Sequence, residues 1–311
     1  MPDSLEFPRY NVDELVYAGS LEKAYGLSGQ RYRFYCEAQY RLQRFDVWPS
    51  VHDHVVAEQL EKAERKRDLL AAHGFEPSAH DDLFEGIRID FVHSTAALEG
   101  GEMSVYEVAS LLSQDAATQR VSFRQQQEVA DIDEAFHFAI EELCKGREMS
   151  VELACDIQRL SARHLHDSQP GKLRADQRYL TATNILPPPP HIVPALLEDA
   201  FSRYNSAKTL SAALAFHLVF EDIHPFADGN GRTGRILLNL MLMQQGYPPI
   251  AIKPSTESNA EYHRAISEFA SQVQTRDASR FAKLALPSLD EELAKRLERI
   301  ERGMTQEQVQ A

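Results

Sequence analysis

Cysteine is scarce in this sequence, and its cysteines follow no pairing pattern. Among 311 residues there are three, Cys36, Cys144 and Cys155. They lie far apart, and no two of them form a Cys-x-x-Cys motif. An odd, widely spaced set argues against a disulfide framework or a cysteine-based metal site. It favours reduced thiols in a cytoplasmic protein.

Long apolar runs and an excess of basic charge are also lacking. The longest apolar stretches, around Leu210–Phe220 and Ile236–Met243, fall far short of the roughly 20 residues that a membrane-spanning helix needs. The first residues have no basic start followed by an apolar run, so no secretory signal is expected. The formal net charge of −14 does not suit a general nucleic-acid binder, which needs a basic surface. We therefore expect no membrane and no nucleic acid among the partners.

One stretch, HPFADGNGRTGR from His224 to Arg235, lies between two apolar helical patterns and predicts a short loop between buried helices. Its glycines let the backbone turn sharply and leave N–H groups bare, which suits a bound anion; they are Gly229, Gly231 and Gly234. No GxxxxGK[ST] motif occurs, which excludes a P-loop enzyme.

The polar side chains of this loop indicate the kind of anion. Arg232 and Arg235 are three residues apart and share one face of the next helix's first turn. Cations there are unfavourable by roughly 0.3–1 kcal/mol each, so a phosphate chain is the expected occupant. Asp228 is out of place beside phosphates unless it binds a hard cation such as Mg²⁺. His224, with an ordinary pKa of about 6.5, can accept a proton near neutral pH.

The same twelve residues resemble the Fic family signature, His-x-Phe-x-Asp/Glu-Gly-Asn-Gly-Arg-x-x-Arg, at every defined position. Fic proteins mostly transfer AMP from ATP to a hydroxyl of a protein. The resemblance implies that His224 deprotonates the target hydroxyl and that Asp228 binds Mg²⁺. It also implies that Asn230, the loop amides and Arg232 hold the α- and β-phosphates of ATP, whereas Arg235 holds the γ-phosphate.

Further upstream, Thr95-Ala-Ala-Leu-Glu99-Gly100 resembles the Ser/Thr-x-x-x-Glu-Gly/Asn pattern of the inhibitory helix found in many Fic proteins. In that class the glutamate pairs with the second arginine of the signature, here Arg235, and blocks productive seating of the γ-phosphate. An arginine that is partly shielded from water needs an anionic partner when ATP is absent, so a pair between Glu99 and Arg235 is physically reasonable. The alternative is an ordinary helix C-terminus with Glu before Gly.

Residues 170–190 lack the helical pattern seen in most of the chain. Extended chain is favoured by Tyr179, Leu180, Thr181 and Thr183, and four prolines then end the stretch without a helix. We therefore expect a β-hairpin. In Fic proteins a hairpin flap lies here and binds the target backbone by strand addition. The resemblance implies that a target protein docks around residues 171–186; a rigid surface loop is the alternative.

Helical patterns cover most of the remaining chain. Ser50 is expected to cap a helix that ends at Gly74, Ser104 and Glu107 to form a capping box, and Ser150 to cap a helix that runs towards His166. Other helices are expected at residues 30–45, 87–99, 124–145, 191–206, 258–275 and 278–286, with Pro287 ending the body. The apolar stripe of the tail beyond it can dock on the body or on a second copy, which allows a homodimer.

These patterns predict an all-α protein, a Fic-type helical bundle with one small β-hairpin flap. We expect an N-terminal helical region at 1–85, an inhibitory helix with the Fic catalytic domain at 86–287, and a C-terminal helical tail at 288–311. The expected function is Mg²⁺-ATP-dependent AMP transfer to Ser, Thr or Tyr hydroxyls of a protein or of the chain itself, held back by Glu99. Two alternatives remain: removal of AMP, with Glu99 positioning a water, and non-catalytic ATP sensing, which would need no base at His224.

Overall fold

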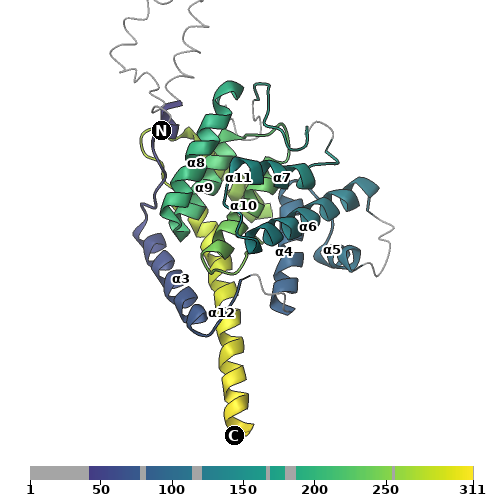
Figure 1. Cartoon of the computed structure of the whole chain (residues 1–311), viewed down its shortest axis with the longest axis vertical. Coiled ribbons are helices and arrows are strands. Elements are labelled where there is room, and N and C mark those ends of the chain that lie inside the picture. The colour runs from purple at the N-terminus through teal and green to yellow at the C-terminus, as the bar shows by residue number, and fades with distance from the viewer. Residues whose placement is uncertain are drawn as a thin grey trace, which may run out of the picture.

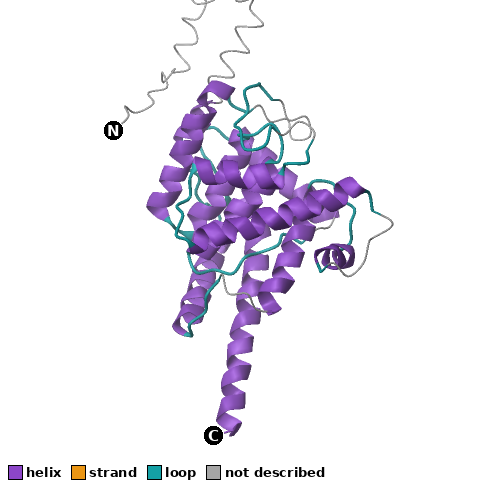
Figure 2. Ribbon diagram, turned by 45° about the vertical axis from the view of Figure 1, so that its right-hand side comes forward, coloured by secondary structure: helices purple, strands orange, loops and turns teal. Residues whose placement is uncertain are grey.

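The computed structural model describes residues 42–77, 82–113, 121–165, 169–178, 187–253 and 256–310. Within them the regular elements are all helical, as Figures 1 and 2 show. Most of the helix expected at residues 30–45, and residues 179–186 of the expected hairpin, lie outside the described residues. In chain order the elements are η2 (Gln43–Asp46), α3 (His54–Ala72), α4 (Asp82–Leu98), α5 (Val105–Leu112), α6 (Phe123–Cys144), α7 (Val151–Ser161), η3 (Pro190–Ile192), α8 (Val193–Ala207), α9 (Leu210–Ile223), α10 (Asn230–Gln244), α11 (Thr256–Ser271) and α12 (Ser279–Gln310).

Helices α9 and α10 form the centre of the bundle. Nearly every side chain of both is buried, as expected for helices surrounded by others. Thr209 begins α9 by accepting a hydrogen bond from the N–H of Ala212 at 3.2 Å. Helices α7, α8, α11 and α12 pack against α9 or α10, and α4 and α6 pack against α10. This arrangement puts the loop between α9 and α10 within reach of α4, α6 and α7.

The helices next to α10 follow the sequence pattern closely. One face of α6 is buried through Val129, Ile132, Phe136 and Ile140, as predicted. The predicted capping box at the start of α5 is present, with the Ser104 N–H donating to the Glu107 carboxylate at 2.8 Å. Helix α4 ends at Leu98, so Glu99 and the left-handed Gly100 follow it directly.

Helices α3 and α12 are far apart in sequence but lie side by side, as Figure 1 shows. Two predictions for them are wrong. Asp53 caps α3 in place of Ser50, because the Asp53 carboxylate accepts from the Val55 and Val56 N–H groups. Pro287 lies inside α12 in place of ending it, since the packing of α12 on α3 offsets the roughly 3 kcal/mol cost of an internal proline.

The first part of the tail therefore continues the bundle, whereas the C-terminal end of α12 projects beyond the other helices (Figure 1). Leu289 and Leu293 of α12 are buried, and Lys66 of α3 pairs with Asp290 at 2.6 Å. Helices α7 and α11 end four or five residues earlier than predicted, at Ser161 and Ser271. No helix in the described ranges is long and apolar enough to cross a bilayer.

Candidate active site

His224 ends α9 and begins the glycine-rich loop. Its φ of 50° and ψ of 61° lie in the left-handed region, which is uncommon for a residue other than glycine. The N–H of His224 still donates to the Phe220 carbonyl at 2.9 Å, so the chain leaves the helix at this residue. The ring atom Nδ1 is buried. We therefore expect Nε2 to be the ring nitrogen that a substrate contacts.

The surroundings of His224 favour a neutral imidazole. Burial, followed by the positive charge of Arg174, lowers the pKa of His224 to about 4. The ring is consequently unprotonated at neutral pH and can accept a proton. This protonation state is the one that a general base needs.

Asn230 shapes the loop from within. Its side-chain oxygen accepts from the Phe226 N–H at 2.8 Å, and its side-chain nitrogen donates to the Phe226 carbonyl at 2.9 Å. Gly229, with a φ of 78°, passes so close to Ala162 that a Cβ would lie 2.7 Å from the alanine methyl. The sequence predicts a phosphate contact for Asn230; the structure adds this structural role, which the motif does not reveal.

Asp228 lies at the exposed rim of the loop. Its carboxylate accepts from the Gly229 N–H at 2.7 Å, and it lines a pocket of about 440 Å³. The described residues contain no group of three or more metal-ligating side chains. A lone carboxylate fits Mg²⁺, because that ion usually takes its other ligands from substrate phosphates and water. The pocket is also lined by Glu99, Gly100, Gly101, Ser122, Arg124, Gln125, Glu128, Leu165 and Arg232.

Arg235 is buried at the far end of the loop and is paired with Glu99. Its Nη2 donates to Glu99 Oε1 at 2.6 Å and to the Thr95 carbonyl at 3.2 Å, and its Nη1 donates to the Tyr262 hydroxyl at 3.2 Å. Burial tends to raise the pKa of Glu99, but Arg235 and then Arg232 outweigh it and hold that pKa low. A Cβ at Gly231 would collide with the Glu99 carboxylate. Glycine is therefore required for this approach.

Arg232 is paired with a carboxylate that the sequence did not reveal. Its Nη2 donates to Glu128 of α6 at 3.1 Å, and its Nη1 donates to the Ser161 carbonyl at 3.4 Å. Glu128 also accepts from Arg124, one helical turn earlier, at 2.9 Å. Both arginines of the loop thus have carboxylate partners from other parts of the chain. The only sequence signal for Glu128 is its i, i+4 spacing from Arg124.

A second buried carboxyl, Glu221, was also missed from the sequence. It lies on α9 against Gly234, where a Cβ would come within 2.7 Å of its Oε1. Burial raises the pKa of Glu221 to about 7, although Arg235 works in the opposite direction. His217, also on α9, contacts the Tyr262 hydroxyl at 3.0 Å. These groups form a polar layer beneath Arg235.

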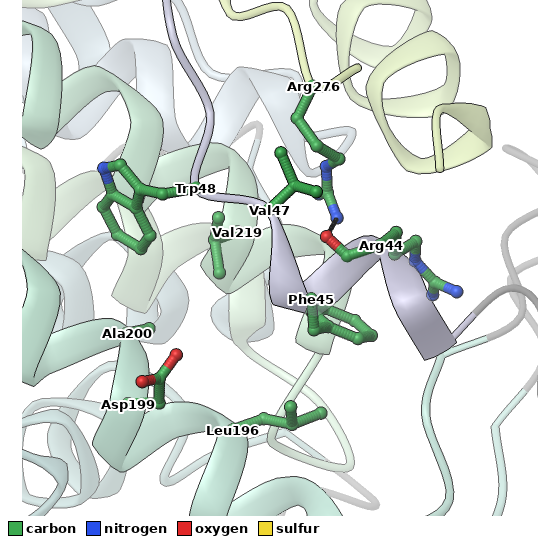
Figure 3. Close-up of a pocket in the computed structure, with 9 residues that line it drawn as sticks. All are labelled: Arg44, Phe45, Val47, Trp48, Leu196, Asp199, Ala200, Val219 and Arg276. Atoms are coloured by element: carbon green, nitrogen blue, oxygen red, sulfur yellow. Dashed lines mark hydrogen bonds between the residues drawn. The ribbon is translucent and has the colours of Figure 1, made fainter. Parts of the chain in front are cut away.

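The end of α9 is also fixed from its outer side. Asp222 accepts from Arg44 at 2.9 Å and from Arg276 at 2.8 Å, and all three side chains are buried. Arg276 also donates to the Arg44 carbonyl at 2.9 Å, as Figure 3 shows. The cavity beside them measures about 10 Å³, space for one water at most. Asp222, two residues before His224, is therefore firmly held.

The described part of the predicted flap contacts the loop directly. Leu173 and Phe226 form an isolated antiparallel bridge, and the Arg174 N–H donates to the Pro225 carbonyl at 2.9 Å. No strand is assigned in residues 169–178. The hairpin expected around 171–186 therefore stays a prediction, because its second half lies outside the described residues.

Comparison with known proteins shows which family the loop and its neighbouring helices resemble. A family model for Fic/DOC proteins matches residues 148–242. The chain carries a Fic/DOC family domain. It is 29% identical over 245 residues to the protein adenylyltransferase Fic of Drosophila ananassae, covering 72% of this chain and 48% of the relative. With its counterpart in Drosophila erecta it shares 30% over 212 residues, covering 66% and 42%. The chain thus spans about half the length of the curated relatives it matches.

Solved structures confirm the all-α Fic fold. Fic-1 from C. elegans matches with a TM-score of 0.65 at 22% identity, over 80% of this chain and 74% of that one. A Fic family protein from Desulfovibrio desulfuricans matches with a TM-score of 0.63 at 21% identity, over 81% and 77%. A Fic domain containing signaling protein from Bacteroides thetaiotaomicron gives 0.61 at 21% identity, over 76% and 90%.

Proposed function

We propose that this protein is an adenylyltransferase that moves AMP from Mg²⁺-bound ATP to a Ser, Thr or Tyr hydroxyl of a target protein or of the chain itself. One observation carries the proposal. A single loop joins a neutral imidazole at His224 to a lone carboxylate at Asp228 and two buried guanidinium groups at Arg232 and Arg235. The similarity to proteins named adenylyltransferases supports the same reaction.

The chemistry follows from the order of these groups along the loop. His224 accepts the proton of the target hydroxyl, whose oxygen forms a bond to the α-phosphorus of ATP while the bond from that phosphorus to the bridging oxygen breaks and pyrophosphate leaves. Arg232, Arg235 and the N–H groups at the start of α10 offset the negative charge on the phosphates. Asp228 would hold Mg²⁺, which neutralises phosphate charge when it is bound.

We further propose that Glu99 restrains this reaction. Its carboxylate accepts a hydrogen bond from Nη2 of Arg235 at 2.6 Å. The γ-phosphate of a productively bound ATP would need the same Nη2 as its donor. A buried arginine gains a charge-assisted hydrogen bond from either anion but cannot give the same donor fully to both. ATP therefore competes with Glu99 for Arg235. Thr95 and Gly100 shape the end of α4 that presents the carboxylate.

Removal of AMP from a modified protein is the second candidate. Glu99 and Asp228 line the same pocket, and the Glu99 side chain is 30% exposed, so its carboxylate can also contact a water there. Incubation of an AMP-modified target without ATP distinguishes the reactions, because only removal releases free AMP. This candidate uses the same loop with a different nucleophile.

The deciding experiment follows the label of ATP into protein. With Mg²⁺ and a host lysate, α-labelled ATP should label protein, whereas γ-labelled ATP should not. His224→Ala should abolish the α-label while leaving the unfolding transition in place. Label from γ-labelled ATP would indicate phosphorylation, and binding of ATP without either label would leave only the sensing role. We propose the cytoplasm as the site of action, with the target docked along residues 171–186.

A further inference from the structure

Arg174 is a buried cation with an unusual set of partners. Its side chain is only 4% exposed, and among the described residues no carboxylate is paired with it. The guanidinium instead donates to backbone carbonyls: to His224 at 2.8 Å, Asp176 at 3.1 Å, Pro188 at 2.5 Å and Ile223 at 3.4 Å. Burying an uncompensated charge is expensive, so these contacts need an explanation beyond packing.

The four carbonyls come from three separate parts of the chain. Ile223 and His224 end α9, Asp176 precedes residues 179–186, and Pro188 follows them. One planar group thus joins both described sides of the predicted target-binding segment to the turn that carries the imidazole. The backbone strengthens this junction, since the Arg174 N–H donates to the Pro225 carbonyl at 2.9 Å.

Gln158 makes a second connection between the same segment and the loop. Its Oε1 accepts from the Gly171 N–H at 2.5 Å, and its Nε2 donates to the Asp228 carbonyl at 3.0 Å. The side chain is fully buried on α7. The segment that begins at Gly171 is therefore fixed near Asp228 by Gln158 and at His224 by Arg174.

We propose that Arg174 is a positioning residue that clamps both sides of the target-binding segment to the backbone of His224, so that a docked hydroxyl and the base keep a fixed separation. The identity of the reaction rests on the proposed function. A misplacement of about 1 Å between reacting groups can slow a reaction roughly a hundredfold, which gives such a clamp its value. Lysine cannot replace it, because a point charge lacks the rigid fork that reaches several carbonyls at once.

The clamp also has an electrostatic consequence. The charged groups that act on the His224 imidazole are Arg174 and Arg178, which lower its pKa, and Glu99, which raises it. Loss of the Arg174 charge should move the pKa of His224 upwards, towards its ordinary value. Arg174→Lys retains the charge and should leave that pKa closer to its value in the parent protein. Geometry and charge can thus be separated by two variants.

The test uses the full chain with Glu99→Gly as the parent protein and α-labelled ATP as the substrate. Arg174→Met should lower kcat/KM for the protein target by about ten- to a hundredfold, with little change in KM for ATP. Arg174→Lys should show a similar loss, because it lacks the fork. Lys145→Met is the matched control, since it removes an exposed cation outside the target-binding segment and should stay within about twofold of the parent.

Equal target kcat/KM for Arg174→Met and Lys145→Met would overturn the inference. If Arg174→Met does not fold, Arg174→Lys keeps the buried charge, and full activity in that variant would overturn it as well. If the parent protein transfers no AMP, the proposed function fails, but NMR titration of the His224 ring still decides the clamp. An unchanged imidazole pKa in Arg174→Met, together with unchanged amide exchange at residues 171–177, would refute it.

Discussion

Glu99 and Arg235 are 136 positions apart in the chain, yet their side chains meet at 2.6 Å over Gly231. The guanidinium side chain is only 4% exposed, and the carboxylate is the anion closest to it. Removal of one partner from a buried pair leaves the other charge uncompensated. Arg235 without Glu99 would therefore have a strong preference for another anion, and a nucleotide phosphate is the one that the loop can accommodate.

The first prediction concerns this pair. Glu99→Gly should raise AMP transfer at least tenfold, since a competing interaction worth about 1.4 kcal/mol changes an equilibrium by that factor. Mass spectrometry of the variant after incubation with ATP, Mg²⁺ and lysate measures the transfer. Glu99→Gln is the control, because it keeps the shape but loses the charge, and it should give an intermediate rate. Equal rates in Glu99→Gly and the unmodified protein would refute the restraint.

The second prediction is the pH profile of transfer. The reaction needs His224 unprotonated, and the pKa of that ring is lowered to about 4 by burial and by Arg174. The Glu99→Gly protein also lacks the carboxylate that raises this pKa, so its kcat/KM should not fall on the acid side until the pH reaches about 4 or lower, well below the value of about 6.5 for an ordinary histidine. Initial rates across this range give the profile. Loss of rate with a midpoint near 6.5 would show that the imidazole is not held neutral as described.

The elements recognised from sequence are those whose signals are local. The loop from His224 to Arg235 is contiguous, and the capping box at Ser104 depends on residues three apart, so neither needs knowledge of distant partners. The sequence did not predict Glu128, Gln158 and Glu221 as site residues, because each contacts the loop only after helices pack together. The prediction that Pro287 ends a helix is wrong for the same reason. Local propensity favours a helix end at this proline, but packing on α3 lets α12 continue past it.

The third prediction concerns the buried carboxyl of Glu221. Its pKa is raised by burial from 4.5 to about 7, so between these values the folded protein binds one more proton than the unfolded chain. The contribution of Glu221 to stability is then fully present below pH 4.5 and is lost as the pH rises to about 7. Glu221→Gln removes this loss, which amounts to about 3 kcal/mol. Urea unfolding at several pH values should show that the free energy of unfolding declines less with rising pH in the variant than in the unmodified protein. The same decline in both proteins would contradict the raised pKa of Glu221.

The last prediction tests how the end of α9 is fixed. Asp222 is completely buried between Arg44 and Arg276, so Asp222→Ala removes a carboxylate that pairs with two buried cations and should cost about 3–5 kcal/mol of unfolding free energy. Asp199 lies on the wall of the same small cavity (Figure 3) but pairs with Arg203 at the surface. Asp199→Ala should therefore change stability by no more than about 0.5 kcal/mol. Urea unfolding measures both variants, and similar losses would show that the buried pair has no special role. Because His224 follows Asp222 by two residues, the first variant should also lower AMP transfer at temperatures where it remains folded.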